Sequence, residues 1–152
     1  MPATLHRATL EDADAIAALV AEAYSPYIPR IGRKPGPMLD DYAQVVRDDE
    51  VYVARQARRI VGLLVLRHQG RELLLANVAV LPACKGQGIG RLLLQACEAQ
   101  ARAAGCEAIR LYTHAAMTEN LALYRKLGYR QTHRAIQDGF PRVFMRKALI
   151  SA

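Results

Sequence analysis

The sequence predicts a mixed α/β domain whose sheet is mostly antiparallel, with about seven strands and about four helices. Three observations support this fold class. Strand-like segments at 51–56, 60–67 and 71–80 are separated by short polar turns, which indicates an antiparallel meander. The third segment runs through a glycine loop and a helix into another strand, which indicates parallel neighbours. Near the end, Asp138-Gly139 separates two further strand-like segments, as in a hairpin.

The amino-terminal part predicts a strand, two helices and a long loop. Residues 4–7 are a strand candidate, and Thr9 followed by Asp12 resembles a capping box at a helix start. That helix places on one face the apolar residues Ile16, Leu19, Val20 and Ala23. Four prolines and two glycines in 25–37 exclude a continuous helix or a central strand, so we expect a loop there. A second short helix is expected at 38–46, with the inward residues Met38, Leu39, Tyr42, Val45 and Val46.

The carboxyl-terminal part predicts two helices and three strands. The helix after the glycine loop carries one row of inward positions at spacings of three and four: Ile89, Leu92, Leu93, Ala96, Gln100 and Ala103. Gly105 is the expected C-cap of that helix. The remaining elements are a buried strand at 107–113, a helix at 118–127 ended by Gly128, and hairpin strands at 129–136 and 142–149.

Length and composition fit one ordered globular domain over residues 1–152. Hydrophobic residues make up 52% and charged residues 23% of the chain, which excludes the composition of a disordered segment. The net charge of +7 is compatible with a nucleic acid, an anionic surface or a multiply phosphorylated ligand. Because the basic residues are scattered, without a dense tract or interleaved aromatic residues, we do not expect a nucleic-acid partner.

The cysteines and the amino-terminal residues indicate the compartment. Cys84, Cys97 and Cys106 are odd in number and form no C-x-x-C pair, so we expect neither a disulfide framework nor a bound metal. Acidic residues precede any long apolar run, so we expect no signal peptide. No run of about 18 apolar residues occurs, so we expect no membrane partner. The expected location is a reducing cytoplasm.

Residues 76–94 read ANVAVLPACKGQGIGRLLL, an apolar strand followed by a glycine loop and an amphipathic helix. Gly86, Gly88 and Gly90 allow several backbone N–H groups to converge, and the helix adds its unpaired first-turn donors and its dipole. Such a place holds a phosphate or a pyrophosphate. A nucleotide P-loop needs Lys and then Ser or Thr after its last glycine, and a dinucleotide fingerprint needs G-x-G-x-x-G spacing. Neither pattern is present.

Two motifs resemble the GNAT superfamily of N-acetyltransferases. Residues 78–91 are similar to that family's acetyl-CoA pyrophosphate loop, with Lys85, Gly88 and Gly90 at the places of Arg or Gln, Gly, and Gly or Ala. Lysine departs from the usual first residue but keeps a long side chain that can reach a phosphate. About thirty residues later, the sequence YRKLGY from Tyr124 is similar to the end of a family helix. The two motifs stand in the family's order.

The resemblance implies a GNAT-like fold, in which the sheet splays apart at the acetyl-CoA site and helices cover both faces. It implies an N-acetyltransferase that moves an acetyl group from its cosubstrate acetyl-CoA to a primary amine of a small molecule or protein, directly and through a ternary complex. Pantetheine is expected against Val78, Ala79 and Val80. The pyrophosphate is expected at the loop residues Lys85, Gly86, Gln87, Gly88, Ile89, Gly90 and Arg91.

Tyr124 matches the family's general acid, whose hydroxyl protonates the departing thiolate. Relatives commonly contact the coenzyme through an Asn seven residues earlier, but Met117 stands there and Asn120 lies one turn later. Asn120 either replaces that contact or simply occupies the first turn of the helix. The general base stays open, because no carboxylate stands near the strand ends and Glu72 lies too early. The candidates are His114 and a chain of water molecules.

The acceptor is expected between the proline-rich loop and the last hairpin. The residues that could shape its pocket or attract a cationic amine are Tyr24, Tyr27, Arg30, Arg33, Asp40 and Asp41. Each of them is also compatible with an ordinary surface role. An alternative function is a module of the same fold that binds acyl-CoA without turning it over. The resemblance also allows a homodimer.

Overall fold

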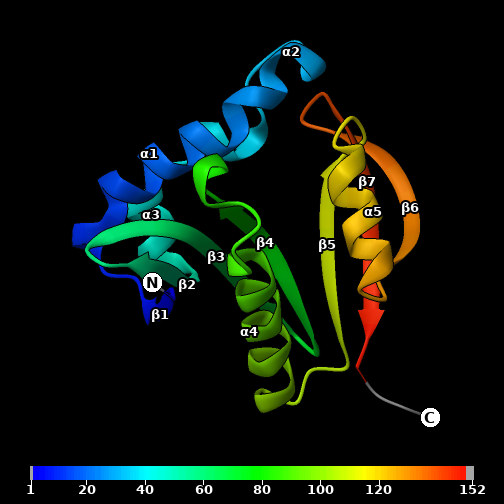
Figure 1. The fold of residues 1–152 in the computed structure, drawn as a ribbon. Helices are drawn as coiled ribbons and strands as arrows, with labels where there is room; N and C mark the ends of the chain where they lie inside the picture. Colours follow the sequence, from blue (N-terminus) through cyan, green and yellow to red (C-terminus); the bar gives the residue numbers. More distant parts are fainter. Residues whose placement is uncertain (1, 150–152) are drawn as a thin grey trace.

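A computed structural model describes residues 2–149 and shows a single sheet of seven strands in the order β1-β2-β3-β4-β5-β7-β6 (Figure 1). The strands are β1 (Thr4–Arg7), β2 (Glu50–Gln56), β3 (Arg59–Gln69), β4 (Glu72–Val80), β5 (Ala108–His114), β6 (Arg130–Gln137) and β7 (Phe140–Ala148). Neighbours are antiparallel except for the parallel pair of β4 and β5. The prediction of a mixed, mostly antiparallel sheet is confirmed.

Helices lie on both faces of the sheet. They are α1 (Ala13–Tyr24), α2 (Ile28–Ile31), α3 (Tyr42–Asp48), α4 (Ile89–Ala103) and α5 (Thr118–Lys126), with 3₁₀ turns η1 (Leu10–Asp12), η2 (Ser25–Tyr27), η3 (Gly36–Leu39) and η4 (Pro82–Cys84). In β3 all residues from Ile60 to Leu66 are buried, so this strand is covered on its two faces, by α1 and by α4. Among residues 2–149, none of the helices has the length and apolar character that crossing a bilayer requires.

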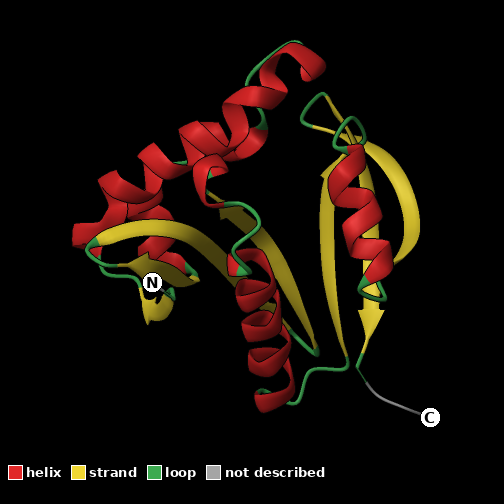
Figure 2. Cartoon of the chain, in the orientation of Figure 1, coloured by secondary structure: helices red, strands yellow, loops and turns green. Residues whose placement is uncertain are grey.

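The sheet splays between its two parallel strands. β4 pairs with β5 only from Glu72 to Leu75, opposite Ala108 to Leu111, and the rest of both strands diverges. β5 meanwhile pairs with β7 along its whole length. Figure 2 shows the consequence: β1–β4 form one wing, β5–β7 form another, and the wings meet at one end only. The splay implied by the family resemblance is therefore present in this chain.

Local sequence signals produce the expected turns and caps. The backbone N–H of Thr9 donates to the carboxylate of Asp12 at 2.9 Å, as a capping box requires. Asp138 and Gly139 have φ of 53° and 77°, which is the left-handed geometry of a tight hairpin turn between β6 and β7. Gly105 follows α4 with φ of 72° and ends that helix.

Two predictions for the region 25–46 were wrong. The segment 25–37 is not a loop throughout, because Pro26, Pro29 and Pro37 each stand second in the short helical elements η2, α2 and η3. A backbone N–H in the first turn has no partner within the helix, so its absence costs nothing there. The second helix begins at Tyr42 rather than at residue 38, since Asp41 caps it by accepting from the N–H groups of Ala43 and Gln44. Leu39 lies outside that helix and is 65% exposed.

Candidate active site

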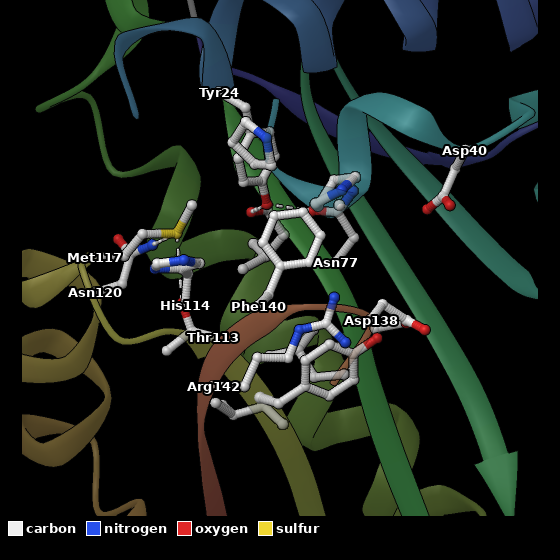
Figure 3. Close-up of a pocket in the computed structure, with 18 of the residues that line it drawn as sticks. Tyr24, Asp40, Asn77, Thr113, His114, Met117, Asn120, Asp138, Phe140 and Arg142 are labelled. Carbon is white, nitrogen blue, oxygen red and sulfur yellow. Dashed lines mark hydrogen bonds between the residues drawn. The ribbon is translucent and has the colours of Figure 1, made fainter. Parts of the chain in front are cut away.

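A cavity of about 370 Å³ lies where β4 and β5 part (Figure 3). Its walls come from the free ends of β4 and β5, from the end of α1, from residues 35–40, from α5 and from the β6–β7 hairpin. In Figure 3, Met117 and Asn120 lie on one side of this cavity and Asp40 lies on the other. A space of this size admits a small acceptor beside the arm of a larger cosubstrate.

The glycine loop ends at the start of α4, next to the free end of β4. Gly86 and Gly88 have φ of 85° and 81°, a backbone conformation that L side chains rarely adopt. A Cβ placed on either glycine would meet no heavy atom within 4 Å, so the space above both is open. α4 is 15 residues long and adds its unpaired first-turn N–H groups. An open, side-chain-free cradle at a long helix start fits a pyrophosphate.

The other predicted residues of this loop surround the cradle. Lys85, Gln87 and Arg91 are exposed, so the charged groups of Lys85 and Arg91 are available to a phosphate. Gln87 accepts a hydrogen bond from the side chain of Gln56 at 3.1 Å, which ties the loop to β2. Ile89 is buried, and its side chain packs against Gly62 of β3. Ile89 therefore anchors the helix start and offers only its backbone to a ligand.

The free end of β4 presents backbone groups to the gap. The N–H of Leu81 donates to the carbonyl of Val61 at 3.0 Å, so Leu81 belongs to a hydrogen-bonded pair with β3. Because bonded and non-bonded residues alternate in an antiparallel pair, Val78 and Val80 direct their N–H and C=O groups toward the gap. Ala79 lies between them with its polar backbone groups on the β3 side. Pantetheine amides could pair with Val78 and Val80.

Tyr124 lies at the cavity on the inner face of α5. It is only 7% exposed, and burial raises the pKa of its hydroxyl well above the ordinary value of 10, so the group stays protonated. Asn120 stands one turn earlier on the same face and also lines the cavity. The amide of Asn120 lies 3.7 Å from the sulfur of Met117, a weak contact that leaves it free to turn toward a ligand.

A chain of hydrogen bonds that the sequence did not reveal begins at the cavity lining, with Tyr24 and Asn77, and continues behind it to Tyr42. The hydroxyl of Tyr24 donates to Oδ1 of Asn77 at 2.6 Å and lies 3.3 Å from the carbonyl of Val78. Nδ2 of Asn77 donates to the hydroxyl of Tyr42 at 3.2 Å, and that hydroxyl donates to the carbonyl of Pro37 at 2.6 Å. The chain fixes β4, α1 and the 35–40 segment relative to one another. Finding Asn77 from the sequence would have required knowing that β4 turns this residue inward.

His114 lines the cavity at the end of β5, but its geometry does not suit a base. Its Nδ1 accepts the backbone N–H of Ala116 at 3.0 Å. Burial, together with the positive charges of Arg142 and Arg33, lowers the pKa of His114 below the ordinary 6.5, so the ring is neutral at pH 7. In a neutral ring whose Nδ1 accepts a hydrogen bond, Nε2 carries the proton and can only donate. His114 is thus a hydrogen-bond donor toward the cavity.

Of the candidate acceptor residues, Tyr24 and Asp40 line the cavity. Burial raises the pKa of Asp40 above the ordinary 3.8, while the charge of Arg67 opposes this shift. Asp41 caps α3 with its side chain. Of the two neighbouring aspartates, Asp40 is therefore the one whose carboxylate can face the cavity. Asp138 is a second carboxylate along the wall.

The remaining candidates hold the segment 25–36 over the cavity. Arg30 forms an ion pair with Glu119 of α5 at 2.7 Å and stacks on the ring of Tyr27 at 5.4 Å. Arg33 donates to the backbone carbonyl of Asp138 at 2.8 Å. These contacts join the end of the amino-terminal wing to the other wing, so they close the cavity rather than line it.

No cysteine belongs to the described lining of the cavity. Cys84, Cys97 and Cys106 are all buried, unpaired thiols elsewhere in the core. In the part of the chain from residue 2 to residue 149, no three His, Cys, Asp or Glu residues gather as a metal would require. The site therefore offers hydroxyl, carboxylate, guanidinium, imidazole, amide and backbone groups.

Comparisons with known proteins identify the family of this chain. The sequence profile of the acetyltransferase (GNAT) domain matches residues 47–131. The chain is 31% identical over 138 residues to the aminoalkylphosphonate N-acetyltransferase of Salmonella typhimurium, a match that covers 85% of this chain and 86% of the relative.

Solved structures share the fold. The PaiA N-acetyltransferase of Thermoplasma acidophilum, in complex with coenzyme A, superposes with a TM-score of 0.81 at 18% identity, covering 97% of this chain and 99% of that one. A GNAT family acetyltransferase of Elizabethkingia anophelis, with acetyl-CoA bound, gives a TM-score of 0.73 at 21% identity over 97% and 99% of the two chains.

Proposed function

Because the chain belongs to the GNAT family of acetyltransferases, with acetyl-CoA as cosubstrate, we propose that the cavity between β4 and β5 receives a primary amine of a small molecule and acetylates it. The strongest support is that three features lie together where β4 and β5 diverge. They are the open glycine cradle, the free edge of β4 and the buried hydroxyl of Tyr124. The Salmonella relative, named for a small-molecule substrate, supports the same acceptor size.

The chain's own residues hold the two reactants in one orientation. We assign the pyrophosphate to the backbone N–H groups from Gly86 to Arg91, with Lys85 as an added charge. The gap-facing backbone groups of Val78 and Val80 are assigned to pantetheine, and Asn120 to a further polar contact. Acetyl-CoA, when bound, supplies an acetyl group as a thioester that an uncharged amine can attack. Holding both groups in position supplies much of the rate acceleration.

Tyr124 is assigned as the general acid. Its hydroxyl keeps its proton at neutral and moderately alkaline pH, and it gives that proton to the sulfur atom that leaves. The absence of a cysteine from the described cavity lining supports direct transfer through a ternary complex over an acyl-cysteine route.

Asp40 is assigned the task of attracting the ammonium and taking up its proton, directly or through water. An Asp40→Asn variant should lose about fivefold in kcat/KM for the amine at pH 7, because one partly exposed ion pair contributes about 1 kcal/mol. The deficit should shrink as the pH approaches the pKa of the amine, since free amine then forms without help. The measurement is coenzyme A thiol release from pH 7 to 10.

Glu22→Gln is the matched control for that variant, because it removes a carboxylate of α1 that lies away from the cavity. Its rates should equal those of the unmodified enzyme. Equal rates for Asp40→Asn over the whole pH range would remove Asp40 from the mechanism.

We further propose that residues 1–152 act as a single acetyltransferase domain in the cytoplasm. The continuous sheet through the described residues supports one domain. Three free cysteines support a reducing compartment. For the assembly we propose a homodimer. Its support is the edge strand β6, which stands last in the order of the described strands and whose eight residues are all exposed, so that a second copy could pair with it.

The direct test of the function is a thiol-release assay with acetyl-CoA and a panel of small primary amines. Acetylated product confirmed by mass spectrometry, in equal amount to the thiol, is the expected result. Saturable binding of acetyl-CoA with no product from any amine would instead favour the alternative, a module that binds acyl-CoA without turnover.

A further inference from the structure

Arg142 of β7 projects into the cavity and carries an unmatched charge. Its guanidinium lies over the ring of Tyr112 at 4.5 Å and over that of Phe140 at 5.4 Å. Its Nη2 atom lies beside Gly36: a Cβ built on Gly36 would be 3.1 Å from that atom. Its hydrogen-bond partner is a neutral amide oxygen, that of Gln137, at 2.5 Å. Within residues 2–149, no carboxylate lies within ion-pair distance of it.

Other partly buried arginines of this chain have an acidic partner. Arg55 pairs with Asp12 at 2.5 Å and Arg146 pairs with Glu72 at 2.7 Å. Partly buried charges are normally compensated in this way, because removing them from water is costly. Arg142 departs from the rule at the one place where a small molecule is expected to bind.

Of the two neighbours of Arg142 at this end of the cavity, Arg33 adds positive charge from outside the lining and His114 adds a hydrogen-bond donor. The guanidinium of Arg33 lies 3.6 Å from the centre of the Phe140 ring, the same ring that Arg142 contacts. The charges of Arg33 and Arg142 both act on His114, whose Nε2–H remains as a donor because Nδ1 accepts from Ala116. Guanidinium and N–H donors gathered without a carboxylate partner match an oxyanion.

We propose that the acceptor is an amine that also carries an oxyanionic group, a phosphonate, phosphate or carboxylate, and that Arg142 binds this group while Asp40 faces the amine. Both charged residues line the same cavity, and the charge of Arg142 acts on Asp40 without an ion pair between them. The cavity lining thus contains both a positive and a negative group, as a zwitterion requires. The proposal rests on the proposed function and narrows its substrate class.

Three primary amines that share an aminoethyl group test the proposal: 2-aminoethylphosphonate and β-alanine, which carry an anionic group, and ethylamine, which does not. The enzyme should acetylate one or both of the anionic amines with a kcat/KM about 30-fold above that of ethylamine, since hydrogen bonds to a charged group contribute about 2 kcal/mol. The preferred anionic amine identifies whether the tetrahedral or the planar oxyanion is recognised. In the Arg142→Gln variant that preference should vanish while the rate with ethylamine stays within about twofold.

Two variants serve as controls. Arg47→Gln removes an exposed arginine of α3 that does not line the cavity and should change none of the three rates. Arg142→Lys keeps the charge but loses the forked donor geometry, so it should retain part of the preference. The ethylamine reaction is the internal reference for Arg142→Gln, because a misfolded variant would lose all three rates. In that case Arg142→Lys would test whether the preference for anionic amines depends on Arg142.

A binding readout separates this proposal from the function on which it rests. Calorimetry with methylphosphonate and with acetate, which have no amine, should show saturable binding to the CoA-loaded enzyme and a loss of it in Arg142→Gln. If either anion binds but no amine is acetylated, the anion site stands and the proposal that the cavity acetylates an amine is overturned. Equal rates with all three amines, unchanged in Arg142→Gln, or the binding of neither anion, would overturn the anion site and leave the acetyltransferase assignment intact.

Discussion

A Gly88→Val variant should lose at least about 100-fold in affinity for acetyl-CoA. Gly88 has φ of 81° and open space where its Cβ would stand, so a valine would place a branched side chain over the cradle and push its backbone toward another conformation. Losing two hydrogen bonds to a charged phosphate costs about 3 kcal/mol, which gives the stated factor. Calorimetric titration of acetyl-CoA into the folded variant measures it.

Gly70→Val is the matched control for that experiment. Gly70 has φ of 66° and equally open surroundings, but it lies in the β3–β4 turn at the other end of β4 from the glycine loop. The two variants should lose similar amounts of thermal stability, because both impose a left-handed conformation on a β-branched residue. Only Gly88→Val should lose acetyl-CoA binding. Equal affinity in the two variants would contradict a backbone cradle at Gly88.

The second large effect is expected at Tyr124. A Tyr124→Phe variant keeps the buried ring and removes only the hydroxyl, so acetyl-CoA binding should be unchanged while kcat falls about 100-fold, the lower end of the range for a general acid. Because burial holds the pKa of Tyr124 above 10, its hydroxyl does not ionise below that pH, and kcat of the unmodified enzyme should show no decline from this group up to pH 10. Steady-state thiol release measures kcat, and calorimetry measures the affinity for acetyl-CoA.

Tyr129→Phe distinguishes that chemistry from the mere loss of a buried hydroxyl. Tyr129 is 5% exposed, meets the Tyr124 ring edge-on at 5.7 Å, and also has its pKa raised by burial, but it does not line the cavity. Its variant should keep kcat within about twofold. Similar rates in both variants would show that Tyr124 supports the fold rather than proton transfer.

Sequence patterns predicted the sheet well because its signals are local. Asp138-Gly139 determines the hairpin turn and Thr9 with Asp12 determines a helix start, each within a few residues. The prolines of 25–37 misled the prediction, since a proline that excludes a long helix is well suited to the first turn of a short one. A local pattern cannot distinguish a loop from a series of short helices, because packing against the rest of the protein determines which of the two forms.

The donor side of the site was more predictable than the acceptor side. Gly86, Gly88 and Tyr124 stand in compact motifs, so their residue types and spacing are informative in the sequence alone. Asn77 and Arg142 belong to no motif, and they reach the cavity only because β4 and β7 present them there. Recognising them requires the splay of β4 from β5, a long-range property of strand pairing.

The crystal structure of this chain with acetyl-CoA tests the central claim most directly. We expect the pyrophosphate oxygens at about 2.7–3.2 Å from backbone nitrogens between Gly86 and Arg91. We expect the thioester in the gap between β4 and β5, beside the hydroxyl of Tyr124. A coenzyme bound elsewhere, or a pyrophosphate held by side chains alone and away from the glycine loop, would contradict the account.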